Sequence, residues 1–256
     1  MVGAWQDTAD AYLRSFARLC AGTVDEMLRL AGPGGGGRRL LDIGTGPGTV
    51  AAAAGRHGHR VIGLDSDRSM IDLAARRNPR IAFGVGALPD LPRRDHAFDV
   101  ITANFVVNHT PDPRRAVAEL YRVTLPGGRL VATIWPARPL PLNQLWAEVL
   151  RRAAASPPPG SRLPPDLDFD RTEAGFAGIL SRAGFDRVDC AELAWTFEIE
   201  PAGLWSAVEA GIGRTYRAQD TAGRAQLRAA YADLTGGADR LRLRSTALIA
   251  CAVRPH

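Results

Sequence analysis

Apolar and polar residues alternate with two different periods along this chain, and these periods predict its elements. Short apolar runs bounded by polar residues or glycine predict buried strands, whereas apolar residues three or four positions apart predict helices. Such runs occur near residues 39–43, 60–64, 80–84, 98–103 and 128–135, with helical spacing between them. Asp112 and Pro113 favour the start of one helix, and residues 126–128 (Pro-Gly-Gly) favour its end. This alternation indicates an α/β fold with a parallel sheet.

Helical spacing also precedes and follows this alternating region. Residues 6–31 are predicted to form one helix, which a glycine-rich joint at residues 33–37 separates from the first strand. Further helices are expected over residues 142–154, 172–183 and 201–237, and strands over 185–197 and 243–253. We therefore expect an N-terminal helical segment (1–37), a cofactor-binding core (38–135) and a C-terminal part of the same domain (136–256), with insertions at about 136–170 and 201–237.

The first predicted strand runs into a glycine-rich turn. Asp42 follows two leucines, and glycines then occupy every second position at Gly44, Gly46 and Gly48. Glycine tolerates positive φ and lets a ligand approach the backbone, and the following helix offers unpaired N–H groups to that ligand. The pattern predicts a loop that binds a nucleotide cofactor.

A second acidic strand end narrows the choice of cofactor. Asp65 ends the run of residues 60–65, where a carboxylate can accept hydrogen bonds from both hydroxyls of a ribose. NAD enzymes and S-adenosylmethionine (SAM) methyltransferases share this arrangement, and glycine spacing separates them only in part. Asp42 favours SAM, because a carboxylate repels a pyrophosphate but attracts the cationic sulfonium and ammonium groups of SAM.

With these motifs, the first half of the chain resembles the class I SAM-dependent methyltransferases, in the small-molecule branch of the ubiquinone- and menaquinone-biosynthesis C-methyltransferases. The matching blocks are residues 42–48, 63–70, 91–100, 104–109, 112–113 and 125–130. The resemblance covers residues 38–135 well and the remainder in outline. It implies a Rossmann-like α/β fold with a seven-stranded sheet whose last strand is antiparallel, helices on both faces, and an inserted helical lid over the cofactor.

The resemblance also implies a set of cofactor-binding residues: Asp42, Gly44, Gly46, Gly48, Asp65, Ser66, Met70, Ala87, Leu88 and Asn104. The glycines would shape the loop around the methionine part of SAM, and Asp65 would bind the ribose. Met70 would cover one face of the adenine, or would simply belong to the core of its helix. Asn104 is expected to present its backbone carbonyl to the amino group of SAM.

The adenine site departs from the family pattern. Relatives often have an aspartate where Ala87 stands, and alanine cannot accept a hydrogen bond from the adenine amine. Either the backbone of Ala87 and Leu88 recognises the adenine, or Asp90 replaces the missing acceptor.

Methyl transfer needs proximity, orientation and exclusion of water, and it needs a base only when the acceptor must lose a proton. His109 is the histidine expected near the reaction centre, and its ordinary pKa suits a general base, although it could instead be a turn residue. The candidate substrate-binding residues are large aromatics: Phe105, Trp135, Trp146, Trp205 and Tyr216. They would suit an apolar small molecule, or they would form the core of the lid.

Composition is typical of a globular enzyme and narrows the partners. The 256 residues are 46% hydrophobic and 23% charged, and the net charge is +5. The sequence contains no lysine, so its permanently positive side chains are all arginines. The arginines are scattered in ones and twos, so we expect a solvated surface, a small-molecule substrate and no nucleic acid. The three cysteines are scattered and show no metal-ligand spacing, so we expect no metal. The sequence shows no signal peptide and no long apolar run, which favours a cytoplasmic protein without a membrane segment, and we expect a monomer or a homodimer.

Alternative functions remain open at this point. An RNA or protein methyltransferase is one, although the chain lacks the Asn/Asp-Pro-Pro-Tyr signature and any lysine for ribose methylation. A regulatory protein that keeps the fold without catalysis is another, and a nicotinamide-dependent reductase is a third.

Overall fold

The computed structural model describes residues 8–156, 163–210 and 214–256. Within these residues the strands form one seven-stranded sheet, in the order β3-β2-β1-β4-β5-β7-β6. The strands are β1 (Arg39–Ile43), β2 (Arg60–Asp65), β3 (Ala82–Val85), β4 (Phe98–Asn104), β5 (Thr124–Ile134), β6 (Asp186–Ile199) and β7 (Leu241–Val253). Neighbouring pairs from β3 to β5 are parallel, and β7 is antiparallel to both β5 and β6. The predicted Rossmann-like sheet with an antiparallel last strand is confirmed.

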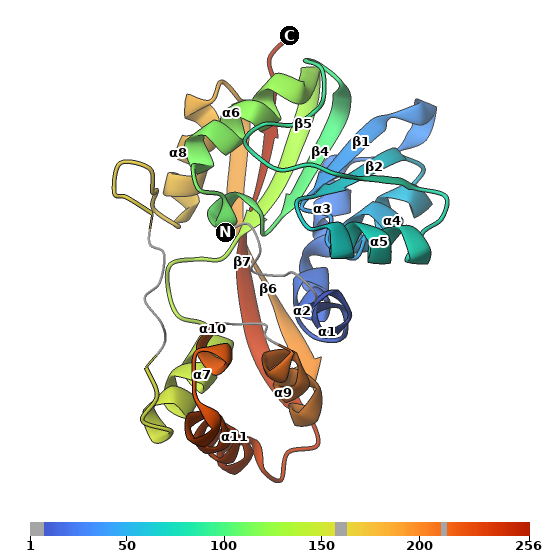
Figure 1. Ribbon diagram of the computed structural model, residues 1–256. Helices are drawn as coiled ribbons and strands as arrows, with labels where there is room; N and C mark the ends of the chain where they lie inside the picture. Colours follow the sequence, from blue (N-terminus) through green and yellow to red (C-terminus); the bar gives the residue numbers. More distant parts are fainter. Residues whose placement is uncertain (1–7, 157–162, 211–213) are drawn as a thin grey trace.

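Helices cover both faces of this sheet (Figure 1). The side chains of β1 alternate between the two faces: Leu40 packs in the cluster that contains α3 (Val24–Ala31) and α4 (Thr49–Arg56), and Leu41 packs with α6 (Pro113–Val123) and α8 (Glu173–Arg182). Because both faces are buried, the strands read in sequence as nearly continuous apolar runs. α5 (Arg68–Arg77) lies beside β2 and β3.

The N-terminal segment differs from the single helix predicted over residues 6–31, of which 6 and 7 lie outside the described residues. It is divided into α1 (Ala9–Arg14), α2 (Phe16–Cys20), a 3-10 turn (Ala21–Thr23) and α3. The break falls at Ser15, whose backbone is not helical and whose hydroxyl donates to the Ala11 carbonyl at 2.7 Å. A buried serine that bonds to the preceding turn competes with the helical ladder, which helical spacing alone does not reveal.

The predicted end of α6 is also corrected. The helix ends at Val123 rather than at residues 126–128, and Thr124 is already extended and pairs with Phe98 as the first residue of β5. Since proline disfavours helical backbone at the residue before it, Pro126 excludes the helix from Leu125 as well.

The two final strands of the sheet extend well beyond the rest of it. β5 pairs with β7 only from Leu248 to Val253, whereas β6 and β7 remain paired as far as Ile199 and Leu241. At the far end of this hairpin lie the lid helices α7 (Pro141–Arg152), α9 (Pro201–Glu209), α10 (Arg214–Arg217) and α11 (Thr221–Thr235). Both insertions predicted at about 136–170 and 201–237 therefore hold helices, and their residues 157–162 and 211–213 lie outside the described residues. The domain boundaries at 37 and 135 stay a prediction.

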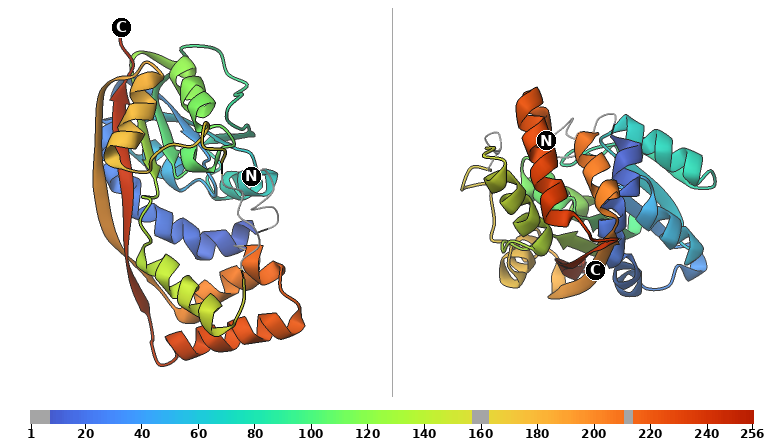
Figure 2. Two further views of the ribbon diagram at one scale, coloured as in Figure 1. Left: turned by 90° about the vertical axis from the view of Figure 1, so that its left-hand side faces the viewer. Right: turned by 90° about the horizontal axis from the view of Figure 1, so that it is seen from below.

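The N-terminal helices lie between the sheet and the lid (Figure 2). On one side of α1, Ala9 packs against Met70 and Leu73 of α5. On another side, Ala11 packs against Ala207 of α9. The N-terminal segment therefore joins the two parts of the molecule.

Candidate active site

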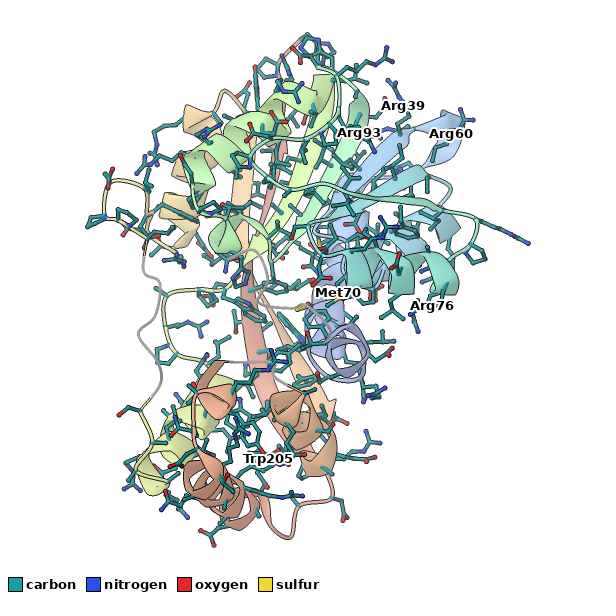
Figure 3. All side chains as sticks on the ribbon, viewed as in Figure 1. Arg39, Arg60, Met70, Arg76, Arg93 and Trp205 are labelled. Carbon is teal, nitrogen blue, oxygen red and sulfur yellow. The ribbon has the colours of Figure 1, made fainter. Side chains whose placement is uncertain are left out.

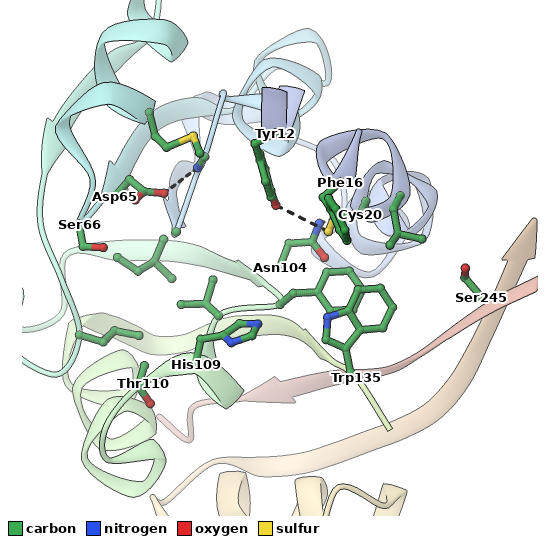
Figure 4. Close-up of a pocket in the computed structure, with 18 of the residues that line it drawn as sticks. Tyr12, Phe16, Cys20, Asp65, Ser66, Asn104, His109, Thr110, Trp135 and Ser245 are labelled. Carbon is green, nitrogen blue, oxygen red and sulfur yellow. Dashed lines mark hydrogen bonds between the residues drawn. The ribbon is translucent and has the colours of Figure 1, made fainter. Parts of the chain in front are cut away.

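A cavity of about 670 Å³ lies where the carboxyl ends of the strands face the lid (Figure 4). Open α/β sheets bind ligands at this edge. The walls come from the glycine loop, the ends of β2 and β4, the N-terminal helices, and the segment that leads from β5 into α7. The lining includes Tyr12, Phe16, Gly44, Gly46, Asp65, Ser66, Met70, Ala87, Leu88, Asn104, Phe105, His109, Trp135 and Arg138.

Glycine is required in the loop for steric reasons. Gly44 has φ +62°, and a Cβ there would lie 2.3 Å from Cγ2 of Val106. Gly48 has φ +82°, and a Cβ there would lie 2.8 Å from Nδ2 of Asn78. Gly44 and Gly46 line the cavity. Gly48 is the N-cap residue that precedes α4, and it does not line the cavity. Gly48 therefore shapes the loop without facing the cavity.

Asp42 is turned into the protein rather than into the cavity. Asp42 is 1% exposed. Its Oδ2 accepts from Thr45 Oγ1 at 2.6 Å and from the Ala51 amide at 3.1 Å. Its Oδ1 accepts from Thr102 Oγ1 at 2.8 Å. Burial raises the pKa of Asp42 to about 6, although these hydrogen bonds oppose the rise. The structure thus gives Asp42 the role of tying the loop to the sheet and to α4, and does not bring it to the cavity wall.

Asp65 does line the cavity, at the carboxyl end of β2. Its Oδ2 accepts from the Gly46 amide at 2.8 Å and its Oδ1 from the Asp67 amide at 2.9 Å. Burial raises the pKa of Asp65, and the amide hydrogen bonds oppose this effect by stabilising the ionised form. Ser66 lies beside it on the wall. Met70 lines the cavity and also packs against Ala9, so both predicted interpretations of this residue fit its position.

The wall at the predicted adenine position is made by Gly86, Ala87 and Leu88. Asp90 pairs with Ala87 through its backbone, but its side chain is 82% exposed, forms an ion pair with Arg115 and does not line the cavity. Its position therefore favours recognition by the backbone of Ala87 and Leu88 over replacement of the missing acceptor by Asp90.

The side chain of Asn104 anchors the N-terminal segment to the sheet. Its Oδ1 accepts from Thr23 Oγ1 at 2.9 Å and from Thr133 Oγ1 at 2.6 Å, and its Nδ2 donates to the Cys20 carbonyl at 3.1 Å. The side chain is thus occupied within the protein, and the contact between the backbone carbonyl of Asn104 and the amino group of SAM stays a prediction.

The sequence prediction missed the contribution of the N-terminal helices to the site. Tyr12, Phe16, Leu19 and Cys20 line the cavity, and Figure 4 shows Tyr12 between Asp65 and Asn104. The Tyr12 hydroxyl donates to Cys20 Sγ at 3.8 Å, and burial raises the pKa of both groups, that of Cys20 to about 12. The helical spacing of these residues predicted packing, and nothing local to them indicated a ligand.

His109 ends a 3-10 turn (Val107–His109) beside the cavity. Solvent reaches its ring through the cavity, and the ring forms no hydrogen bond with any of the described side chains or backbone groups. The surrounding protein and the positive charge of Arg171 lower the pKa of His109, so the ring is neutral at neutral pH. A neutral imidazole facing a cavity can accept a proton from a bound molecule.

Two of the five predicted substrate-binding aromatics reach the cavity. Phe105 and Trp135 line it and stack with ring centroids 3.9 Å apart and planes 17° apart. Trp146, Trp205 and Tyr216 do not line it. They belong to the core of the lid: the ring centroids of Trp146 and Trp205 lie 5.4 and 5.0 Å from that of Tyr231, and the ring of Tyr216 lies 5.6 Å from that of Trp205. The structure therefore favours the lid-core interpretation for these three residues, since the lid needs its own apolar core.

The described residues contain no group of three or more His, Cys, Asp or Glu side chains arranged to hold a metal ion. None of the helices in the described part of the chain is long and apolar enough to cross a membrane.

Residues 41–132 match the family described as "Methyltransferase domain". The chain is similar to demethylmenaquinone methyltransferases from three bacteria. It is 36% identical to that of Renibacterium salmoninarum over 118 residues, which cover 46% of this chain and 50% of the relative. It is 31% identical to that of Clavibacter sepedonicus over 158 residues (59% and 64%) and 32% identical to that of Thermobifida fusca over 166 residues (59% and 70%). The match thus spans about half to two thirds of these relatives' length.

Solved structures with this fold include the YcgJ protein of Bacillus subtilis, with a TM-score of 0.61, 19% identity and coverage of 91% of this chain and 98% of that one. Phosphoethanolamine N-methyltransferase 2 of Haemonchus contortus, in complex with S-adenosylhomocysteine, has a TM-score of 0.58, 20% identity and coverage of 99% and 59%. The [4+2]-cyclase SpnF has a TM-score of 0.56, 23% identity and coverage of 93% and 82%. At these identities the likeness shows the fold, which is shared by a methyltransferase and a cyclase, so chemistry has to be argued from the site.

Proposed function

The chain belongs to the class I SAM-dependent methyltransferases, and from this premise we propose that it transfers a methyl group from SAM to a ring carbon of a planar, largely apolar small molecule that carries a hydroxyl group. One observation carries the proposal. Gly44 and Asp65 line the same cavity as the stacked rings of Phe105 and Trp135, so a cofactor half and an apolar half meet in one space.

The cofactor half fits SAM. Gly44 and Gly46 leave the turn free of side chains, and Asp65 presents a buried carboxylate that can accept from two ribose hydroxyls. Met70 and Leu88 offer apolar surface for an adenine. When bound there, SAM supplies a methyl group already activated by the sulfonium.

The acceptor half favours an uncharged planar molecule. The Phe105–Trp135 stack supplies a flat apolar wall, and further apolar lining comes from Phe16, Leu140 and Leu142. Arg138 is a charged residue on this wall, but its guanidinium donates to Glu192 Oε2 at 2.7 Å and is thereby neutralised. This pairing leaves little net charge at that part of the wall, which favours an uncharged acceptor.

His109 would remove a proton from the acceptor. Deprotonation of a ring hydroxyl would move electron density onto the neighbouring ring carbon and make it the nucleophile for the activated methyl group. The C–S bond of SAM would break as the C–C bond forms, with S-adenosylhomocysteine as the leaving group, and loss of the proton on that carbon would restore the ring. The neutral state of the His109 imidazole and its position on the cavity wall support this role. The names of the relatives, demethylmenaquinone methyltransferases, support carbon rather than oxygen or nitrogen as the acceptor atom.

Incubation with isotopically methyl-labelled SAM and a panel of naphthols, quinols, catechols and aliphatic amines tests the proposal. We expect labelled product from the hydroxylated rings, with NMR placing the label on carbon. Transfer to oxygen or nitrogen alone would contradict the acceptor assignment. Tight SAM binding without transfer to any ring or small-molecule extract would favour the non-catalytic alternative.

A further inference from the structure

Another cavity, of about 830 Å³, opens at the edge of the sheet opposite the active site. It lies at the amino ends of β1 and β2, at the end of α4 and along the loop between α5 and β3. It shares no lining residue with the active-site cavity. Its basic lining residues are Arg39, Arg56, His59, Arg60 and Arg80. Figure 3 shows Arg39 and Arg60 at the end of the sheet remote from Met70.

The charge of this cavity is unbalanced. Its lining contains no aspartate or glutamate among the described residues, and Arg56, Arg60 and Arg80 have no carboxylate partner in the described part of the chain. Arg39 reaches Asp99, with Nε to Oδ2 at 3.6 Å. Other arginines, such as Arg182 and Arg244, also lack a carboxylate partner in the described part of the chain, so what distinguishes this cavity is that several arginines line one space.

Backbone pairing brings two of these arginines together. Arg39 and Arg60 are register partners in the parallel β1–β2 pair, so their side chains leave the same face of the sheet one strand spacing apart. Arg56 lies in the last turn of α4, where the helix dipole already favours a cation, but that effect does not extend to the other arginines. An anion that binds between the side chains of Arg39 and Arg60 would offset the repulsion between their positive charges.

His59 also lines this cavity but adds no positive charge to it. It is only 6% exposed, and its Nε2 lies 3.1 Å from the Gly32 carbonyl oxygen. Because a carbonyl oxygen only accepts, Nε2 carries the proton, and Nδ1 is buried without a partner among the described residues. Burial lowers the pKa of His59, so the positive charge of the cavity comes from its arginines.

The lining also distinguishes between kinds of anion. The planar guanidinium of arginine can donate two parallel hydrogen bonds to the oxygens of one phosphate group, and several arginines around one cavity suit more than one phosphate group. Single-stranded nucleic acid would need exposed aromatic rings for its bases, whereas the aromatic residue here, Phe98, is buried. The absence of exposed stacking rings among the described lining residues favours a compact anion over a polymer.

We propose that this cavity, lined by Arg39, Arg56, His59, Arg60 and Arg80, is a binding site for a small molecule bearing a diphosphate or longer phosphate chain, separate from the methyl-transfer site.

Titration calorimetry with inorganic pyrophosphate at constant ionic strength tests the proposal, with sulfate as the control anion. The double variant Arg60→Gln/Arg80→Gln should bind pyrophosphate about tenfold more weakly than the wild type or not at all. The matched control Arg182→Gln/Arg244→Gln removes the same charge from exposed arginines outside this cavity and should bind within about twofold of the wild type. SAM affinity should be equal in all three proteins, which also shows that each is folded.

Several outcomes would overturn the proposal. These are no binding of pyrophosphate to the wild type, equal binding of sulfate, or equal weakening in the two double variants. Salt-sensitive binding of a single-stranded RNA oligonucleotide that pyrophosphate cannot displace would identify a nucleic-acid surface instead.

Discussion

Gly46 and Asp65 are joined across the active-site cavity wall, because the Gly46 amide donates to Asp65 Oδ2 at 2.8 Å. One carboxylate therefore fixes the loop and lines the cavity. Asp65→Asn should lower SAM affinity by about 10- to 100-fold, since hydrogen bonds to a charged acceptor contribute about 1.5–3 kcal/mol. Asp90→Asn is the control, because that side chain is exposed and paired with Arg115. Calorimetry should show unchanged affinity for the control. Equal affinity in the Asp65 variant and the wild type would contradict the ribose assignment.

Gly44 tests the backbone geometry of the loop. Gly44→Ala places a side chain at φ +62° and a Cβ against Val106, so we expect a loss of stability of about 1–3 kcal/mol together with weaker SAM binding. Gly35→Ala is the matched control, because a Cβ there meets nothing within 4 Å. Thermal denaturation measures both changes. If the Gly44 variant were as stable as the control, the steric argument would be wrong.

Asp42 should make stability depend on pH. Burial raises its pKa from 3.8 to about 6 in the folded state, so the folded protein holds this proton more tightly than the unfolded chain. The folding free energy is therefore more favourable at low pH, and up to about 3 kcal/mol is lost as the pH rises from 3.8 to above 6. In Asp42→Asn the amide oxygen can accept from Thr45 and Ala51, and the amide nitrogen can donate to Thr102. Denaturant titrations from pH 4 to 8 should therefore show a smaller loss of stability for Asp42→Asn than for the wild type.

The same variant tests the electrostatic role of Asp42. Removal of its negative charge should weaken SAM more than S-adenosylhomocysteine, because only SAM carries the sulfonium charge. Competition binding at pH 8 measures the ratio of the two affinities. A ratio equal to that of the wild type would leave Asp42 with a purely structural role.

His109 should control the pH dependence of the reaction. Because its pKa is lowered, the neutral base persists below about pH 6.5, and kcat of the wild type should fall only below that value. His109→Gln should lower kcat by about a hundredfold or more and lose this acidic limb, while SAM affinity stays unchanged. A variant with the wild-type rate from pH 6 to 9 would exclude base catalysis by His109.

Substitutions at Trp135 and Trp146 test which aromatic residues bind the acceptor and which form the core of the lid. Trp135→Leu removes the ring stacked on Phe105 and should raise the KM for a planar acceptor about tenfold. Trp146→Leu removes a ring stacked on Tyr231 and should lower the melting temperature with little effect on that KM. The opposite assignment of the two effects would show that the lid aromatics bind the acceptor.

The glycine loop and Asp65 could be predicted from sequence because their signal is local: residues that form or follow the turn also line the cavity. Tyr12 and Phe16 could not, because they reach the cavity only through the break at Ser15 and the anchoring of Thr23 to Asn104, 81 residues further along the chain. Trp146 and Trp205 lie on inward helix faces, and apolar spacing alone does not distinguish the core of a lid from the wall of a cavity.

The long β6–β7 hairpin has a consequence for the engineering of this enzyme. Helices α9, α10 and α11 are inserted between Ile199 and Leu241, at the end of the hairpin that does not pair with β5. The pairing of β7 with β5 therefore does not depend on these helices. None of their described residues lines the active-site cavity, and they contact α1 and α7, which carry lining residues. A different helical stretch at this place would therefore reach the acceptor only indirectly, and chimaeras joined at Ile199 and Leu241 would measure that effect.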